Sequence, residues 1–200
     1  MEEYIINFAT KIQRLIRNNV KISHLGLENV KVICGLDVAY KGEVGYAVCV
    51  SHDLASNSFT YRYVKGEVKF PYIPGYLFMR EAPLMLSLLD NSKCDLVLVD
   101  GHGLAHPRMA GIATVIGVLQ DLPTIGVAKS KLYGNIKIEN NIEYIIVNNI
   151  KVGIKVNKFY YSIGHKTDLD DVLRIANESS GYPRVLKEAD RISKRLRDET

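Results

Sequence analysis

LVLVDGHGLAHPR, at residues 96–108, is the stretch from which the fold can be worked out. Its unbroken apolar run, residues 96–99, is typical of a short strand that is buried on both faces of a sheet. Asp100 stands at the carboxyl end of this strand, and a loop rich in glycine and histidine follows it. Open α/β sheets carry their chemistry at the carboxyl ends of their strands. We therefore interpret Asp100 as a functional acid or as the cap of the next helix, and this stretch alone leaves both readings open.

The segments on the amino-terminal side of this strand predict a helix and then three antiparallel strands. Residues 3–19 have apolar positions at helical spacing. Residues 31–40 and 44–50 are rich in β-branched residues, and a Lys-Gly-Glu turn between them indicates a hairpin. Residues 59–70 alternate well enough to form a third strand.

Two more carboxylates stand out in this part of the chain. Asp37 interrupts an apolar strand, where a charge is costly unless it is paired or bound to a metal, although an ordinary edge-strand aspartate is the alternative. Glu81 is expected in the first turn of a helix that begins around residues 80–82, because Pro83 suits only a first turn. The alternative for Glu81 is a residue that the helix dipole favours there.

The rest of the chain alternates between helices and strands, without a repeat or a linker. We expect a helix at 109–119, a strand at 123–128, short antiparallel strands within 135–163, a turn at 162–165, a helix capped by Asp168 and a basic helix at about 183–196. The whole chain, residues 1–200, is predicted to be one α/β domain. Its mixed sheet would have three antiparallel strands followed by parallel strands, with helices on its faces.

Composition limits the class of protein without naming a function. The formal net charge of +4 is compatible with a nucleic-acid partner, but many enzymes have a similar charge. The three cysteines are scattered and lie in apolar runs, which favours buried free thiols. The chain lacks an apolar run of the ~20 residues that a membrane span needs, and its amino terminus lacks the uniform apolar block that is typical of a signal peptide. We therefore expect a cytoplasmic protein that does not bind a membrane.

Topology brings the carboxylates together. A right-handed crossover would lay the strand that ends at Asp100 parallel to the first strand, so that Asp37 and Asp100 lie side by side and Glu81 approaches from the covering helix. Such a cluster needs a divalent cation, and its oxygen ligands suit Mg²⁺ or Mn²⁺. Lys129 could offset phosphate charge, and His165 could orient or deprotonate water. For Lys129 a solvated loop lysine is the alternative, and for His165 a turn residue that bonds backbone.

Five segments of this chain resemble endonuclease V, a repair nuclease of the RNase H-like fold class that acts at deaminated adenine. They are GLDVAY at 35–40, PYIPGYLFMREAP at 71–83, DGHGLAHPRMAGIA at 100–113, TIGVAKSKLYG at 124–134 and SIGH at 162–165. The resemblance implies a metal-dependent DNA repair endonuclease. It would recognise deoxyinosine and hydrolyse the second phosphodiester bond 3′ to the lesion, with Mg²⁺ as cofactor and Mn²⁺ able to substitute.

The resemblance also implies roles for individual residues. The metal site would be Asp37, Glu81 and Asp100, supported in catalysis by Lys129 and His165. The prolines at 71 and 74 stiffen a loop that presents Tyr72, and the resemblance makes this loop, Tyr72, Ile73, Pro74 and Gly75, a wedge that fills the gap left by the flipped base. The lesion pocket would be lined near Leu77, Gly103, His106, Gly111 and Leu132.

Two departures from the family pattern and two alternative functions remain. Family members usually have His at position 115 and often Pro at position 163, where this chain has Val115 and Ile163. The first departure could change packing or DNA contacts, and the second could loosen the turn that aims His165. An endoribonuclease for inosine-containing RNA is the near alternative, and a non-catalytic binder of damaged nucleic acid is the other. The expected partner is damaged DNA, double- or single-stranded, with no obligate protein partner.

Overall fold

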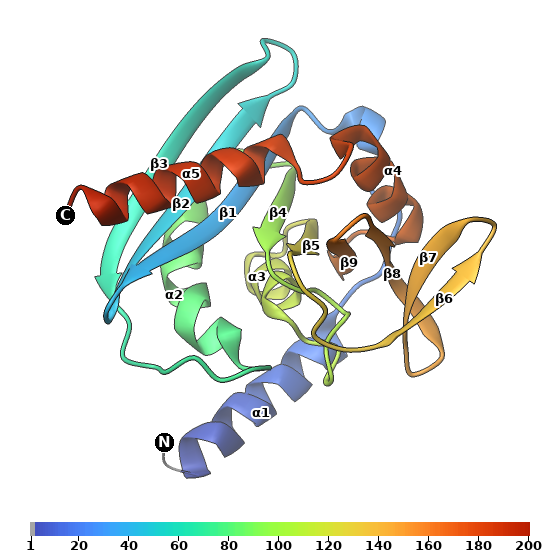
Figure 1. Ribbon diagram of the computed structural model, residues 1–200, viewed down its shortest axis with the longest axis horizontal. Coiled ribbons are helices and arrows are strands. Elements are labelled where there is room, and N and C mark those ends of the chain that lie inside the picture. Colours follow the sequence, from blue (N-terminus) through green and yellow to red (C-terminus); the bar gives the residue numbers. More distant parts are fainter. Residues whose placement is uncertain (1–2) are drawn as a thin grey trace.

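The computed structural model describes residues 3–200 and has helices on both faces of a single mixed sheet (Figure 1). The strands are β1 (Val32–Lys41), β2 (Val44–Asp53), β3 (Ser58–Glu67), β4 (Leu96–Asp100), β5 (Thr124–Ala128), β6 (Asn135–Glu139), β7 (Ile142–Val147), β8 (Ile150–Val156) and β9 (Phe159–His165). The α-helices are α1 (Glu3–Asn19), α2 (Leu77–Leu89), α3 (Ile112–Gln120), α4 (Leu169–Ser179) and α5 (Arg184–Asp198), and a 3-10 turn spans Leu27–Asn29.

The order of the strands in the sheet is β3-β2-β1-β4-β5-β9-β8-β7-β6. The first three strands are antiparallel, as their hairpin sequence predicts. The strand that ends at Asp100, β4, lies parallel to β1 and between β1 and β5, which confirms the predicted crossover. β9 pairs antiparallel with β5, and β8, β7 and β6 then follow β9 in antiparallel order to the edge of the sheet. The predicted mixed α/β architecture is therefore confirmed.

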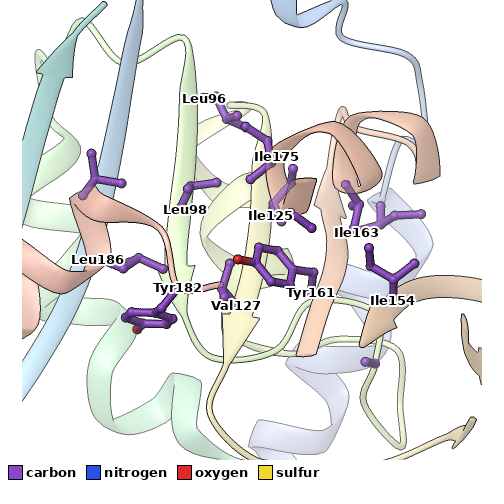
Figure 2. Packing of buried hydrophobic residues seen from close by; sticks show 14 of the residues in the cluster. Leu96, Leu98, Ile125, Val127, Ile154, Tyr161, Ile163, Ile175, Tyr182 and Leu186 are labelled. Carbon is purple, nitrogen blue, oxygen red and sulfur yellow. The ribbon is translucent and has the colours of Figure 1, made fainter. Parts of the chain in front are cut away.

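Two hydrophobic clusters, one on each face of the sheet, hold the layers together. On one face α1, α2 and α3 cover side chains that include Leu36, Val97 and Val99. On the other face α4 and α5 cover a cluster that includes Leu96 and Leu98 of β4 (Figure 2). Neighbouring residues of β4 thus point to opposite faces, and all four apolar residues of the strand are buried. Burial on both faces explains why the first four residues of β4 are all apolar.

Two local predictions are wrong. α2 begins at Leu77, so Pro83 lies inside the helix rather than in its first turn. Pro83 is exposed, and water can therefore bond the carbonyl that loses its helical partner. The predicted turn at 162–165 is instead the end of β9, whose Ser162 pairs with Gly126 of β5.

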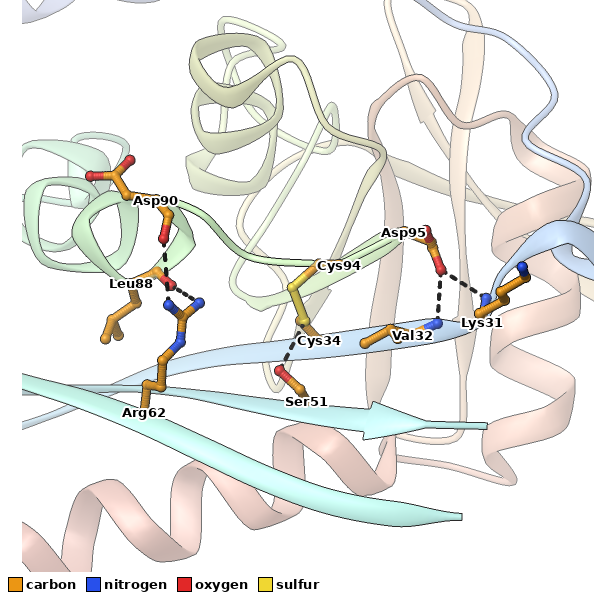
Figure 3. Close-up of a disulfide and its surroundings, with 9 residues drawn as sticks. All are labelled: Lys31, Val32, Cys34, Ser51, Arg62, Leu88, Asp90, Cys94 and Asp95. Carbon is orange, nitrogen blue, oxygen red and sulfur yellow. Dashed lines mark hydrogen bonds between the residues drawn. A yellow bond between two sulfur atoms is a disulfide. The ribbon is translucent and has the colours of Figure 1, made fainter. Parts of the chain in front are cut away.

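The cysteines also differ from the prediction of three free thiols. Cys34 of β1 and Cys94, just before β4, form a disulfide, and only Cys49 is a thiol (Figure 3). The bond is possible because β1 and β4 are neighbours, which brings the two Cα atoms within 5.7 Å of each other. Among residues 3–200 we also find no helix that combines the length and the apolar character needed to cross a bilayer.

Candidate active site

Asp37 and Asp100 lie on adjacent parallel strands at the same edge of the sheet. Leu36 pairs with Val99, so the next residue of each strand is one of these aspartates. Both follow residues that face α1–α3, and both therefore point toward the opposite face, which α5 covers. One carboxylate oxygen of each lies within 4.8 Å of the other and of an oxygen of Asp190 on α5. This edge thus carries three clustered acids.

Asp190 is the residue of this cluster that the sequence did not reveal. It lies on α5 among charged neighbours, in the run KEADRISKR, within the helix that the sequence predicts only as basic. In the structure its carboxylate accepts hydrogen bonds from Lys129 Nζ at 2.9 Å and Lys194 Nζ at 2.7 Å. Three residues further along α5, Ser193 Oγ donates to Asp37 Oδ2 at 2.8 Å. Burial of Ser193 shows that this side of α5 faces the polar site, and the sequence of the helix has no local signal for it.

Glu81 reaches the same cavity from the other face of the sheet. It is buried on α2, and its Oε1 accepts a hydrogen bond from Tyr40 Oη at 3.2 Å. The cavity has a volume of about 570 Å³, and Asp37, Glu81, Asp100 and Lys129 all line it. Glu81 is not one of the acids that lie within 4.8 Å of one another. It stands across the cavity from the pair that β1 and β4 carry.

Burial and mutual repulsion raise the pKa values of these acids. Burial first, and then the charge of Asp100, raise the pKa of Asp37 to about 7, although the Ser193 hydrogen bond opposes the shift. Burial and then the charge of Asp37 raise the pKa of Glu81 to about 8. Removing acids from water and placing them together disfavours their charged forms unless a cation is near. Their oxygens form a donor set that suits a hard divalent ion such as Mg²⁺.

Lys129 is the cation that the structure itself provides at this edge. It follows β5, and its Nζ donates to Asp100 Oδ2 at 2.7 Å as well as to Asp190. Burial alone would lower its pKa, but the charges of Asp100 and Asp190 raise it overall. Lys129 therefore stays protonated and links β4 to α5. A solvated loop lysine, the alternative reading, would not make these two contacts.

The proline-containing loop at 71–75 is anchored at its last residue. The carbonyl oxygen of Gly75 accepts hydrogen bonds from Gln13 Nε2 at 2.8 Å and from Arg108 Nη2 at 2.7 Å, and it lies 3.0 Å from His106 Nε2. Gln13, buried on α1, is a second residue that the sequence did not single out, because its helix looked purely structural. Tyr72 is 67% exposed and lines the cavity. The loop thus combines a fixed base with a free aromatic ring.

Four of the five residues expected around a lesion pocket line this same cavity. They are Leu77, His106, Gly111 and Leu132. Gly103 does not line it. A side chain at Gly103 would collide with the carbonyl oxygen of Ile163 on β9, so this glycine serves the packing of the loop against the sheet. Burial lowers the pKa of His106 to about 4, so its ring is neutral near pH 7.

His165 is at the wrong edge of the sheet for the role that was expected of it. It ends β9, and it pairs with Thr124, the first residue of β5, whereas Asp100 is the last residue of β4 and Lys129 directly follows the last residue of β5. Its ring is buried, accepts a hydrogen bond from the backbone N–H of Lys21 at 3.2 Å, and lies near Asp121. β9 runs antiparallel to β5, so its carboxyl end cannot share the edge with theirs. The prediction that His165 acts on water at this site is therefore wrong.

His102 lines the cavity, and its Nδ1 has no hydrogen-bond partner among the described residues. Val115 is buried against the α1–α3 face, so its departure from the family pattern concerns packing. Ile163 lies within β9 rather than in a turn, and its carbonyl oxygen accepts the N–H of Leu104.

Comparisons with known proteins agree on one family. The family model for endonuclease V matches residues 14–191. An endonuclease V of Sulfurisphaera tokodaii is 59% identical over 197 residues, which cover 98% of each chain. The crystal structure of the endonuclease V from Streptomyces avermitilis has a TM-score of 0.84 with 31% identity, over 96% of this chain and 93% of that one.

A third comparison concerns a structure with a nucleic acid. The endonuclease V of Ciona intestinalis was crystallised in complex with a 24mer DNA containing an inosine followed by a ribo-adenosine. It superimposes with a TM-score of 0.83 and 26% identity, over 99% of both chains.

Proposed function

The chain belongs to the endonuclease V family, a family of nucleases, and from this premise we propose that it is a divalent-metal-dependent DNA repair endonuclease. Its substrate would be deoxyinosine-containing DNA, and the bond hydrolysed would be the second phosphodiester 3′ to the lesion. The observation that carries the proposal is the cluster of Asp37, Asp100 and Asp190, of which Asp37 and Asp100 line one cavity with Glu81. A protein that only binds nucleic acid has no use for clustered acids, which repel phosphate.

The acids fit a divalent ion on physical grounds. Without a cation the pKa values of Asp37 and Glu81 are raised to about 7 and about 8, because burial and like charge both oppose ionisation. A divalent ion favours the ionised forms, and a donor set of oxygens alone favours Mg²⁺ or Mn²⁺ over zinc. Asp37, Asp100, Asp190 and Glu81 would hold it. When bound, such an ion supplies Lewis-acid stabilisation of the phosphate and activates a water.

The residues around the acids fix their positions and offset charge. Ser193 donates to Asp37 Oδ2, which leaves the other oxygen of that carboxylate to face the cavity. Lys129 carries a positive charge between Asp100 and Asp190, where it can also stabilise charge that develops on a phosphate oxygen. Preorganised charges of this kind need no rearrangement during the reaction.

The rest of the cavity suits a base that has left the stack. The anchored loop holds Tyr72 at its tip, beside a hollow lined by Leu77, His106, Gly111 and Leu132. Unstacking a base costs a few kcal/mol, and an inserted aromatic ring can partly offset that cost. We propose that Tyr72, with Ile73, Pro74 and Gly75, forms this wedge and that the hollow receives hypoxanthine.

A single assay tests the reaction. A labelled duplex with one deoxyinosine, and its deoxyadenosine counterpart, are incubated with and without Mg²⁺, and the products are read at nucleotide resolution. We expect one Mg²⁺-dependent nick, at the second bond 3′ to deoxyinosine. Asp100→Asn and Asp37→Ala should abolish the nick and keep lesion binding, whereas the surface control Asp198→Asn should cut normally. Full-rate cutting by either active-site variant would remove the metal site from the account.

The wedge has its own test. Tyr72→Ala should weaken binding to the inosine-containing duplex, and Tyr63→Ala, which removes an exposed tyrosine from β3, should not. Unchanged affinity in Tyr72→Ala would refute the wedge role.

Matched RNA and DNA oligonucleotides separate the remaining alternative. The Ciona relative was crystallised with a ribonucleotide after the inosine, which makes an RNA arm worthwhile. Faster cleavage of inosine-containing RNA than of the matched DNA would assign the chain to RNA. Binding of either without cleavage would assign it to the non-catalytic class.

A further inference from the structure

We propose that His24, Asp168 and Asp171 form a second metal site, for a divalent transition-metal ion of the Zn²⁺ type. The site would join the connector between α1 and β1 to the first turn of α4. It lies near His165 and thus at the edge of the sheet away from Asp100 and Lys129. The inference does not depend on the proposed nuclease function.

The three side chains converge on one point. His24 Nδ1 lies 3.0 Å from Asp168 Oδ2 and 3.6 Å from Asp171 Oδ1, and one ligand atom of each residue lies within 4.8 Å of the other two. Nitrogen and oxygen ligands bind Zn²⁺ at about 2.0–2.2 Å, which separates neighbouring ligands by roughly 3.0–3.6 Å. Both distances to His24 fall in this interval.

The hydrogen bonds of α4 leave these two oxygens free. Asp168 and Asp171 form a reciprocal capping box, in which Asp168 Oδ1 accepts the N–H of Asp171 and Asp171 Oδ2 accepts the N–H of Asp168. Asp171 Oδ2 also accepts the N–H of Leu25. The oxygens that face His24 are the two that the box does not use, so a ligand could bind there without disturbing the cap.

Asp171 supplies the observation that points to a ligand. Its side chain is fully buried, yet Oδ1 has no hydrogen-bond partner among residues 3–200. A buried carboxylate oxygen without a partner is costly, and it is aimed at His24. A single N–H on His24 Nδ1 cannot serve Asp168 at 3.0 Å and Asp171 at 3.6 Å equally well. A metal ion bound by all three would satisfy both carboxylates at once.

The ligand types indicate which ion fits. An imidazole nitrogen with carboxylate oxygens suits Zn²⁺ and similar ions, whereas Mg²⁺ prefers oxygen alone. The side chain of His24 is 55% exposed, so the ion could enter from solvent and complete its shell with water. The surroundings are acidic, because Asp170 lies in the same first turn and Glu28 is close by on the connector, while Arg174 is paired with Glu28.

Zn²⁺ titration by calorimetry tests the site. The titrations are done at pH 7.5, with Mg²⁺ in excess, in a background of Asp37→Asn and Asp100→Asn that removes two of the three clustered acids at the other site. We expect one Zn²⁺ to bind and to raise the melting temperature. His24→Gln should weaken binding at least tenfold and remove the rise in melting temperature. His52→Gln, which changes a histidine at the end of β2 that contacts Asn57 instead of an acid, should bind as the background does.

The outcomes separate an ion from a proton. If a protonated His24 alone bridges the two carboxylates, Zn²⁺ will leave the melting temperature unchanged in every variant. Only the pH dependence of the melting temperature will then differ between His24→Gln and the background. That result would overturn the proposal, as would equal Zn²⁺ binding with and without His24. Neither result would bear on cleavage of deoxyinosine, which is measured separately in the chain without substitutions.

Discussion

Ser193 of the last helix donates a hydrogen bond to Asp37 of the first strand over 2.8 Å. This contact joins the two ends of the chain at the acid cluster, and both residues are buried. It fixes one oxygen of Asp37 and leaves the other for the cavity. The carboxyl-terminal helix is therefore part of the candidate site and does more than cover the sheet.

Ser193→Ala tests this contact. The change leaves a buried carboxylate oxygen without its donor, which costs on the order of 1–3 kcal/mol. We expect the free energy of unfolding in urea to fall by about that amount and the rate of nicking to fall with it. The control is Ser87→Ala, an exposed serine on α2 that bonds only its own helix, and it should stay within about 0.5 kcal/mol of the unchanged protein. Equal stability of the two variants would mean that the Ser193 contact carries no weight.

We expect substitutions of Asp190 and of His165 to have different effects on the rate of cleavage. Asp190 lies with Asp37 and Asp100, so Asp190→Asn should lower single-turnover cleavage by at least a hundredfold while lesion binding persists. His165 lies at the other edge of the sheet, so His165→Gln should lower thermal stability but keep the rate at saturating Mg²⁺. A His165→Gln variant that folds normally and does not cut would restore His165 to the mechanism and contradict the assignment made here.

His106 should make the protein sensitive to acid. Burial holds its pKa at about 4, below the 6.5 of an exposed histidine, so the unfolded chain binds the proton first. The stability that neutral His106 contributes is therefore complete above pH 6.5, and it falls as the pH drops toward 4, by up to roughly 3 kcal/mol. Between pH 7.5 and pH 4, the free energy of unfolding in urea should fall more for the unchanged protein than for His106→Asn. The control His52→Asn changes a half-buried histidine at the end of β2, and it should lose as much free energy of unfolding over this pH range as the unchanged protein does.

The disulfide between Cys34 and Cys94 should stabilise the fold measurably. It closes a loop across a separation of 60 residues, which in the chain-entropy account contributes roughly 4 kcal/mol. We expect a reductant to lower the free energy of unfolding by an amount of this order. The double variant Cys34→Ala/Cys94→Ala should not respond to the reductant, and Cys49→Ala should respond fully. If a reductant left the free energy of unfolding unchanged, the result would show that the thiols are free, as the sequence alone suggested.

Local patterns in the sequence predicted most of the sheet, but not the direction in which distant segments return to it. The hairpin of β1 and β2 and the buried strand before Asp100 follow from alternation and from an apolar run, and a right-handed crossover then makes β1 and β4 neighbours. His165 was misplaced because nothing local reveals that β9 runs antiparallel to β5. Asp190 was missed because only packing turns one acid of a charged helix toward Asp37.

The same reason explains the cysteines. Cys34 and Cys94 are far apart in sequence, and the predicted pairing of their strands does not by itself determine the directions of their side chains. Contacts between residues on different strands can thus be predicted only when the register of the strands is known as well as their order.

The central claim is that Asp37 and Asp100 share a divalent cation. The direct measurement is an anomalous difference map from crystals of this protein grown with Mn²⁺, recorded for the unchanged protein and for Asp100→Asn. We predict a peak at direct coordination distance from both carboxylates, and its loss in the variant. A map with no peak between Asp37 and Asp100 in the unchanged protein, from crystals that hold Mn²⁺ elsewhere, would contradict the claim.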